Sequence, residues 1–70
     1  MRVIREVTLK FMPLEGKVTD LPVGHYVVIM EGDRRGYMEV INISNGRLAI
    51  VNGRFYFDTA NVTHYAVWPE

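Results

Sequence analysis

The chain of 70 residues contains no cysteine, so disulfide bonds and metal sites built on thiolates are excluded. A domain of this size buries only about 60% of the surface that its unfolded chain exposes, which leaves a marginal core. A small chain without disulfide bonds can still be stabilised by a well-packed small barrel or by self-association. Because hydrophobic residues make up 49% of the chain, homo-oligomerisation is a credible alternative.

Excess charge is also missing, because eight basic and eight acidic residues cancel and no block of one sign occurs. This balance argues against a protein whose affinity comes mostly from neutralising phosphates, although a local basic patch is compatible with it. No apolar run approaches the roughly 18 residues of a membrane span, and the first residues lack the apolar stretch of a secretion signal. We therefore expect a cytoplasmic protein that makes no membrane contact.

Groups for catalysis and metal binding are sparse. The only serine, Ser44, lies in a predicted turn, so no nucleophile with a base and an orienting group is indicated. His25 and His64 are 39 residues apart, without carboxylates at ligand spacing. Glu31 and Asp33 could supply a pair of carboxylates, but at a turn that carries Arg34 and Arg35 they are better explained as solvated partners of those arginines. We expect no enzymatic activity, no metal and no cofactor.

Two Asn-Gly pairs, at 45–46 and 52–53, are the strongest local features of the chain. Asn-Gly between apolar runs favours a two-residue hairpin turn, because both residues tolerate positive φ. The two turns would pair Ser44 with Arg47 and Val51 with Arg54, and alternation then assigns each side chain to a face.

The first of these two faces is wholly apolar, and we predict that it is buried. It carries Ile41, Ile43, Leu48, Ile50, Phe55 and Phe57. The second face is mixed and is predicted to meet solvent. It carries Val40, Asn42, Ser44, Arg47, Ala49, Val51, Arg54, Tyr56 and Asp58.

Further strands are predicted at residues 2–12, 25–31, 36–44 and 62–68. The segment 25–31 has apolar residues at both odd and even positions, so both of its sides are predicted to be covered, which indicates a central strand. Between the first two strands, residues 13–24 contain two prolines and two glycines and predict a long loop of the kind that is often functional. No helix of normal length fits. The pattern predicts an all-β fold, a small five- to six-stranded antiparallel barrel or twisted meander forming one domain over residues 1–70.

Three positions leave questions open. Alternation places Glu39 on the apolar face, which predicts a bulge near Met38 or a site beyond the edge of the core. His64 and Trp68 are predicted to pack, His64 partly buried and Trp68 as a core plug, with a binding role as the alternative for each. Residues 59–61 are predicted to form a short connector, either irregular or one helical turn.

Residues 28–41, VIMEGDRRGYMEVI, resemble the KOW segment of small Src-homology-3-like barrels in ribosomal and transcription-elongation proteins. In that family an apolar strand runs into a basic turn with glycine, followed by a second glycine and a Val-rich strand. Residues 51–54, VNGR, are also similar to ribosomal KOW proteins. The resemblance implies an RNA-binding barrel with contacts at Arg34 and Arg35.

The segments 21–28, LPVGHYVV, and 62–70, VTHYAVWPE, are similar to a family of short phage and prophage proteins of unknown function. Its members have an early Leu-Pro, a glycine before an apolar strand and a closing Val-Thr-His-Trp with Pro-Glu nearby; here Tyr65 replaces that tryptophan. The resemblance implies a phage accessory protein that acts by binding.

Three functional hypotheses follow. The first is a non-enzymatic binding module that engages a host or self protein, since protein interfaces favour Arg, Tyr and Trp without net charge. Its predicted partner-binding residues are Arg34, Arg35, Arg47, Arg54, Tyr56 and Tyr65. The second is a KOW-like barrel that binds RNA or DNA through the Arg34-Arg35 turn. The third is an enzyme or small-ligand binder, which would need a pocket that 70 residues scarcely enclose without subunit assembly.

Overall fold

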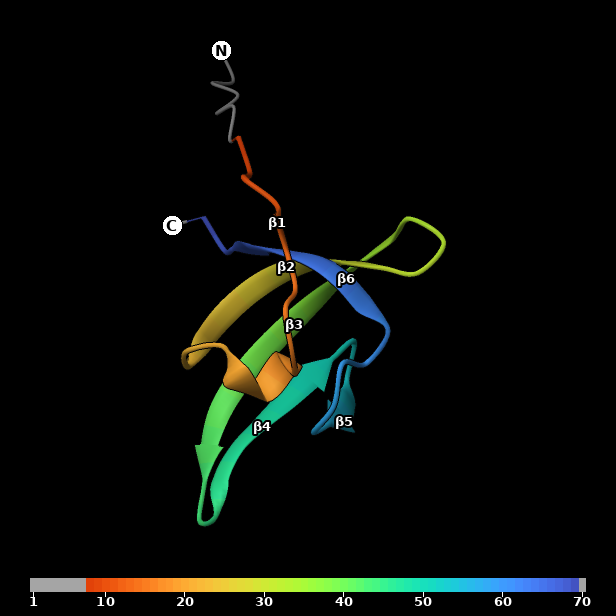
Figure 1. The fold of residues 1–70 in the computed structure, drawn as a ribbon. Helices are drawn as coiled ribbons and strands as arrows, with labels where there is room; N and C mark the ends of the chain where they lie inside the picture. Colours follow the sequence, from red (N-terminus) through yellow and green to blue (C-terminus); the bar gives the residue numbers. More distant parts are fainter. Residues whose placement is uncertain (1–7, 70) are drawn as a thin grey trace.

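A single curved antiparallel sheet of six strands forms the protein, as the computed structural model shows for residues 8–69 (Figure 1). The elements are β1 (Met12–Pro13), a 3₁₀ turn η1 (Val18–Asp20), β2 (Gly24–Met30), β3 (Arg34–Ile43), β4 (Gly46–Val51), β5 (Arg54–Tyr56) and β6 (Val62–Val67). The strand order is β1-β6-β2-β3-β4-β5, and over the described residues the two edge strands do not pair. The predicted all-β fold is confirmed, in the form of an open, barrel-like curl.

The central strand is predicted correctly, whereas the first strand is not. β2 pairs with β3 on one side and with β6 on the other. The part of the predicted strand 2–12 that precedes residue 8 lies outside the described residues, and residues 8–11 form no strand. β1 pairs only at Met12 with Tyr65 and at Pro13 with His64. Pro13 is tolerated there because an edge strand does not need every backbone N–H.

The two Asn-Gly pairs form different turns. Val51 pairs with Arg54 as predicted, and Asn52 and Gly53 have φ of 49° and 84°, as a type I′ turn requires. In the other hairpin Ile43 pairs with Gly46, so the turn lies at 44–45 and the predicted Ser44–Arg47 pair is wrong. Arg47 instead pairs two residues away, with Asn42. Because side chains alternate along a strand, a shift of the pairing register by two residues leaves each side chain on the face to which it was assigned.

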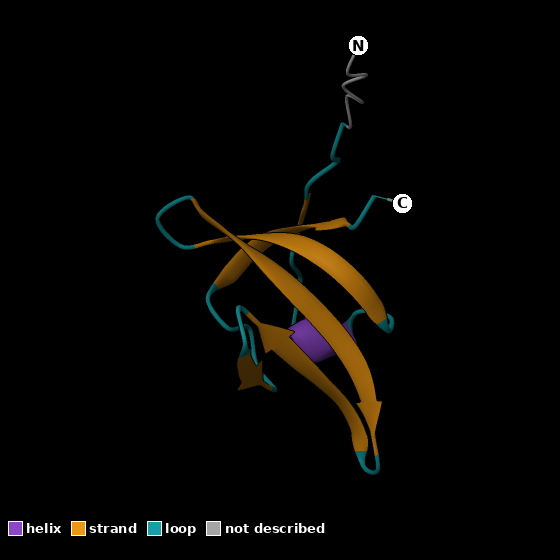
Figure 2. Ribbon diagram, turned by 180° about the vertical axis from the view of Figure 1, so that it is seen from behind, coloured by secondary structure: helices purple, strands orange, loops and turns teal. Residues whose placement is uncertain are grey.

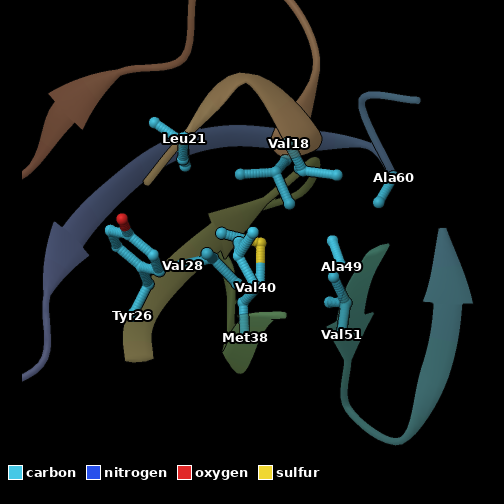
Figure 3. Close-up of a cluster of buried hydrophobic side chains, with 10 residues drawn as sticks. Val18, Leu21, Tyr26, Val28, Met38, Val40, Ala49, Val51 and Ala60 are labelled. Atoms are coloured by element: carbon cyan, nitrogen blue, oxygen red, sulfur yellow. The ribbon is translucent and has the colours of Figure 1, made fainter. Parts of the chain in front are cut away.

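The prediction of which face is buried is wrong. Val40, Ala49 and Val51 of the mixed face are buried, whereas Phe55 and Phe57 of the apolar face are 69% and 59% exposed. The buried residues line the inside of the curl and meet residues of η1, β2 and β6 in one cluster (Figure 3). That cluster consists of Val18, Leu21, Tyr26, Val28, Met38, Val40, Ala49, Val51, Ala60 and Val62.

The segment 13–24 decides this facing, because it lies against the inner side of the curved sheet (Figure 2). Val18 in η1 is fully buried, and its backbone N–H donates to the Asp58 carbonyl at 2.9 Å. Asp20 Oδ2 accepts from the Lys17 backbone N–H at 3.0 Å and closes the 3₁₀ turn. The predicted loop is therefore an ordered lid over the core.

The bulge predicted near Met38 does not exist. β3 keeps an unbroken register against β2 and β4, and the irregularity lies between Ile29 and Met30, where β2 meets β6. Glu39 lies on the outer face opposite His25, with 3.7 Å between Oε2 and the histidine Nε2. A carboxylate beside Ile41 is tolerated because that face meets solvent.

Candidate functional site

Arg34 and Arg35 are adjacent in sequence but project from opposite faces of β3, because side chains alternate along a strand. The Arg35 guanidinium lies over the ring of Phe11 on the outer face, 5.6 Å from the ring centre. Arg34 lies on the inner side, where its Nε is 3.4 Å from the Glu31 carbonyl oxygen. The two arginines therefore do not form one basic patch.

Arg47 and Tyr65 support the structure of the domain. Arg47 Nη1 donates to the Leu21 carbonyl at 2.7 Å and so ties β4 to the lid. Tyr65 packs edge-to-face on Tyr26, with ring centres 5.9 Å apart. Burial raises the pKa of the Tyr26 phenol above its ordinary value of 10.0; the nearby Tyr65 raises it further and Arg47 opposes the shift. Arg47 and Tyr65 were both predicted as site residues, but neither lies with the other predicted arginines.

Arg34, Arg54 and Tyr56 are brought together at one hollow of about 330 Å³, which we call the Arg34–Arg54 hollow. It lies beside the core, to which its lining residues Val51 and Ala60 belong. Its lining residues are Met30, Arg34, Val51, Asn52, Arg54, Tyr56, Ala60 and Asn61. Of the six residues predicted from the sequence, these three meet.

Three turns position the polar side chains of the hollow. Arg34 follows the β2–β3 turn, and Asn52 and Arg54 belong to the type I′ turn between β4 and β5. The predicted connector at 59–61 is not helical: Ala60 and Asn61 have φ of 52° and 58°, and Val62 N–H donates to the Thr59 carbonyl at 2.9 Å. This third turn joins the first through a 2.9 Å hydrogen bond from the Glu31 N–H to the Asn61 carbonyl.

Gly36 and Asn52 hold the β4–β5 turn against β3. Asn52 donates its backbone N–H to the Tyr37 carbonyl at 2.9 Å and accepts from the Tyr37 N–H at 3.0 Å through Oδ1. The side chain lies so close over Gly36 that a Cβ there would be 2.7 Å from Asn52 Nδ2. Only glycine permits this approach without displacing Asn52.

The Arg34–Arg54 hollow carries charge of one sign, since two of its eight lining residues are arginines and none is acidic. A second hollow of about 260 Å³ lies beside β1 and the lid and contains Glu15, Lys17 and Asp20, hence both signs. The ion pair found among residues 8–69 joins His25 and Glu39, so neither Arg34 nor Arg54 pairs with a described carboxylate.

The apolar residues on the convex side form a second candidate surface, the outer apolar face: Ile41, Ile43, Leu48, Ile50 and Phe55 of β3 to β5, together with the exposed Phe57 that directly follows β5. Cross-strand pairing makes it continuous, because Ile41 lies opposite Leu48 and Ile50 opposite Phe55. Ile43 is 38% exposed, and the two phenylalanines are the most exposed members. The composition of this face is readable from the sequence, but its exposure is not.

An aromatic cluster on the outer face was missed by the sequence analysis. His25 stacks on Tyr37 and its Nδ1 hydrogen-bonds the Tyr37 hydroxyl, while Trp68 meets Tyr37 edge-to-face with ring centres 5.1 Å apart. Trp68 is 46% exposed, so the predicted core plug is wrong, and His64 is exposed rather than partly buried. His25 and Tyr37 meet through the pairing of β2 with β3, and Trp68 is held beside them by a 2.9 Å hydrogen bond from its backbone N–H to the His25 carbonyl. No local sequence pattern displays these contacts.

Residues 8–69 contain no group of three or more His, Cys, Asp or Glu side chains that could hold a metal ion. Over the same part of the chain, no helix has the length and apolar character needed to cross a membrane.

Comparison of the chain with protein-family models, with curated proteins and with solved structures gave no match. The resemblances to KOW segments and to short phage proteins therefore stay predictions. The proposals below are based on the Arg34–Arg54 hollow and the outer apolar face.

Proposed function

We propose that this protein is a small binding module that acts without catalysis and engages a protein partner through the outer apolar face. The observation that carries this proposal is the exposure of Phe55 and Phe57, 69% and 59%, beside three isoleucines and a leucine. Soluble monomers rarely expose contiguous apolar patches larger than a few hundred Å², and larger ones mark interaction sites.

The chemistry of the face favours a protein rather than a nucleic acid. Aromatic residues are enriched and charged residues are depleted at the centres of protein interfaces. The charged side chain that adjoins this face is Glu39, which lies opposite Ile50 and contacts His25 on its other side, whereas Arg35 lies farther along β3 opposite Ile29. The class of function is the one that the sequence predicts, but the surface differs, because Arg47 and Tyr56 lie on the inner side.

The test is affinity capture from lysate with the full chain, with and without nuclease, comparing the wild type with the double variant Phe55→Ser/Phe57→Ser. The control is Val67→Ser, which removes a side chain that is 71% exposed but lies on β6, outside the face. We expect a stoichiometric protein partner that survives nuclease, is kept by the control and is lost with the double variant. A second copy of the chain is one admissible partner, and light scattering at several concentrations identifies it.

Capture that the double variant leaves unchanged, or a wild type that binds no protein and stays monomeric, would contradict the proposal. Nucleic acid recovered only without nuclease and lost as salt rises would instead favour the KOW-like alternative.

A further inference from the structure

The Arg34–Arg54 hollow is a separate surface from the outer apolar face, because its residues Val51 and Tyr56 lie on the inner side of the sheet. We propose that this hollow binds a small organic phosphate, a phosphate monoester whose organic part is compact and apolar or aromatic. This proposal does not rest on the protein-binding function proposed above.

The charge of the hollow points to an anion. Arg34 and Arg54 line the same small space, and no acidic residue lies among its lining residues. Two positive charges repel each other, and an anion bound between them is attracted to both. The planar fork of arginine matches phosphate oxygens with two parallel hydrogen bonds, and two such forks suit a dianion.

Neutral polar groups add hydrogen-bonding capacity at the same place. Asn52, Asn61 and Tyr56 line the hollow with two amides and one hydroxyl, each of which can donate to a phosphate oxygen. Asn52 Oδ1 is occupied by the Tyr37 N–H, which fixes the orientation of the amide. The hydrogen bond that its side chain makes with the described residues is this one, through Oδ1, so Nδ2 can donate to a ligand.

The volume and the apolar lining of the hollow indicate an organic group attached to the phosphate. Its volume of about 330 Å³ is at the lower end of small-molecule sites, which span about 300–1,000 Å³. Val51 and Ala60 in its lining are buried in the core, but Met30 is only partly buried, and a bare phosphate ion would leave the Met30 side chain exposed to water. A compact apolar or aromatic group would cover it.

The probe is phenyl phosphate, titrated into the isotope-labelled full chain and followed by amide chemical shifts. We expect saturable shifts at Arg34, Asn52, Arg54 and Asn61. Arg34→Gln and Arg54→Gln should each weaken binding about tenfold or more, since each removes hydrogen bonds to a charged ligand. Arg35→Gln is the matched control, because it removes the same charge one residue away on the opposite face, and should change affinity by no more than about twofold.

Inorganic phosphate should bind more weakly than phenyl phosphate, and phenol should not bind. An equal loss in Arg35→Gln and Arg34→Gln, shifts that do not saturate, or phenol binding as tightly as its phosphate would each overturn the proposal. Inorganic phosphate binding as tightly as phenyl phosphate would overturn the assignment of an organic group. All three arginines are exposed, so unchanged melting of the variants confirms that the fold is intact.

Discussion

At the scale of single residues, Tyr26 joins the sheet to the lid. It is 5% exposed, and its hydroxyl donates to the Pro22 carbonyl at 2.6 Å. Its ring also supports Tyr65 on the neighbouring strand β6. A phenol placed in this way resists ionisation, because burial disfavours the phenolate and a phenolate cannot donate to a carbonyl.

Replacing Tyr26 with Phe should lower the free energy of unfolding by about 1 kcal/mol at neutral pH, because the hydrogen bond to Pro22 is lost while the ring stays. The native pKa of Tyr26 is raised, so above about pH 10 the unfolded chain loses this proton before the folded one does. The stability of the wild type therefore falls as the pH rises through that window, and the Phe variant should fall less. Denaturant unfolding of both proteins across that range measures the difference.

Tyrosines that do not contact Tyr26 contribute equally to both proteins, so the difference between the two curves reports Tyr26 together with its coupling to Tyr65. Identical alkaline losses of stability would show that its pKa is the same in the folded and unfolded chains.

At the scale of elements, the two Asn-Gly pairs show that identical dipeptides can have different structural roles. Asn52 has φ of 49° and makes two hydrogen bonds to Tyr37, so it fixes the β4–β5 turn against β3. Asn45 occupies the centre of the β3–β4 turn, is exposed and does not have positive φ. The doubled Asn-Gly-Arg is therefore no functional repeat, and only its second copy helps to form the Arg34–Arg54 hollow.

We expect Asn52→Ala to lower the free energy of unfolding by about 1–2 kcal/mol, from the cost of positive φ for alanine and the lost hydrogen bond to the Tyr37 N–H. Asn45→Ala is the matched control and should change it by less than about 0.5 kcal/mol. Chemical denaturation of both variants makes the comparison. Equal destabilisation would mean that the two turns are held in the same way.

At the scale of the whole molecule, the lid over residues 13–24 completes the core. The sheet cannot bury both of its faces, and the face that receives Val18 and Leu21 becomes the inside. The other face meets solvent, although it carries the outer apolar face over the second half of β3, β4 and β5. A loop of the kind that is often functional was predicted here, and in the structure this segment covers the inner face of the sheet and leaves the outer face exposed.

The two valines of the lid test this role, since Val18 is fully buried and Val23 is 51% exposed. Val18→Ala should lower the free energy of unfolding of the entire domain by about 2 kcal/mol, through lost burial and the cavity left behind. Val23→Ala should cost less than about 0.5 kcal/mol. Hydrogen exchange at β2 and β3 should report the loss in Val18→Ala as faster exchange across both strands. Faster exchange confined to the lid would show that the lid is a separate, dispensable unit.

Much of the fold could be predicted because strand formation, turn chemistry and alternation are local. Residues that share a face were grouped correctly even where the register was wrong by two. Glu39 carried the one local signal against burial of the apolar face, since a carboxylate beside Ile41 and Ile43 fits an exposed surface. That conflict was explained instead by a bulge near Met38, which the register of β3 excludes, or by a position of Glu39 beyond the edge of the core.

The candidate site was predicted only in part. Arg34, Arg54 and Tyr56 were singled out and do meet, whereas Arg35 was grouped with Arg34 because the two are neighbours in sequence. Alternation along β3 places them on opposite faces, a separation that was overlooked because the segment was interpreted as a turn. The meeting of Arg34 with Arg54 depends on three turns that are distant in sequence.

By itself the sequence determined the all-β class, the central strand, the type I′ turn at Asn52-Gly53 and the composition of both sheet faces. Each of these follows from interactions between near neighbours in the chain. Only the tertiary structure decided which face is covered and which arginines share a hollow. Those outcomes depend on Val18 packing against strands 20 or more residues away in the sequence and on hydrogen bonds between separate turns. Periodicity shows that a face is apolar, but burial requires another part of the molecule to cover it.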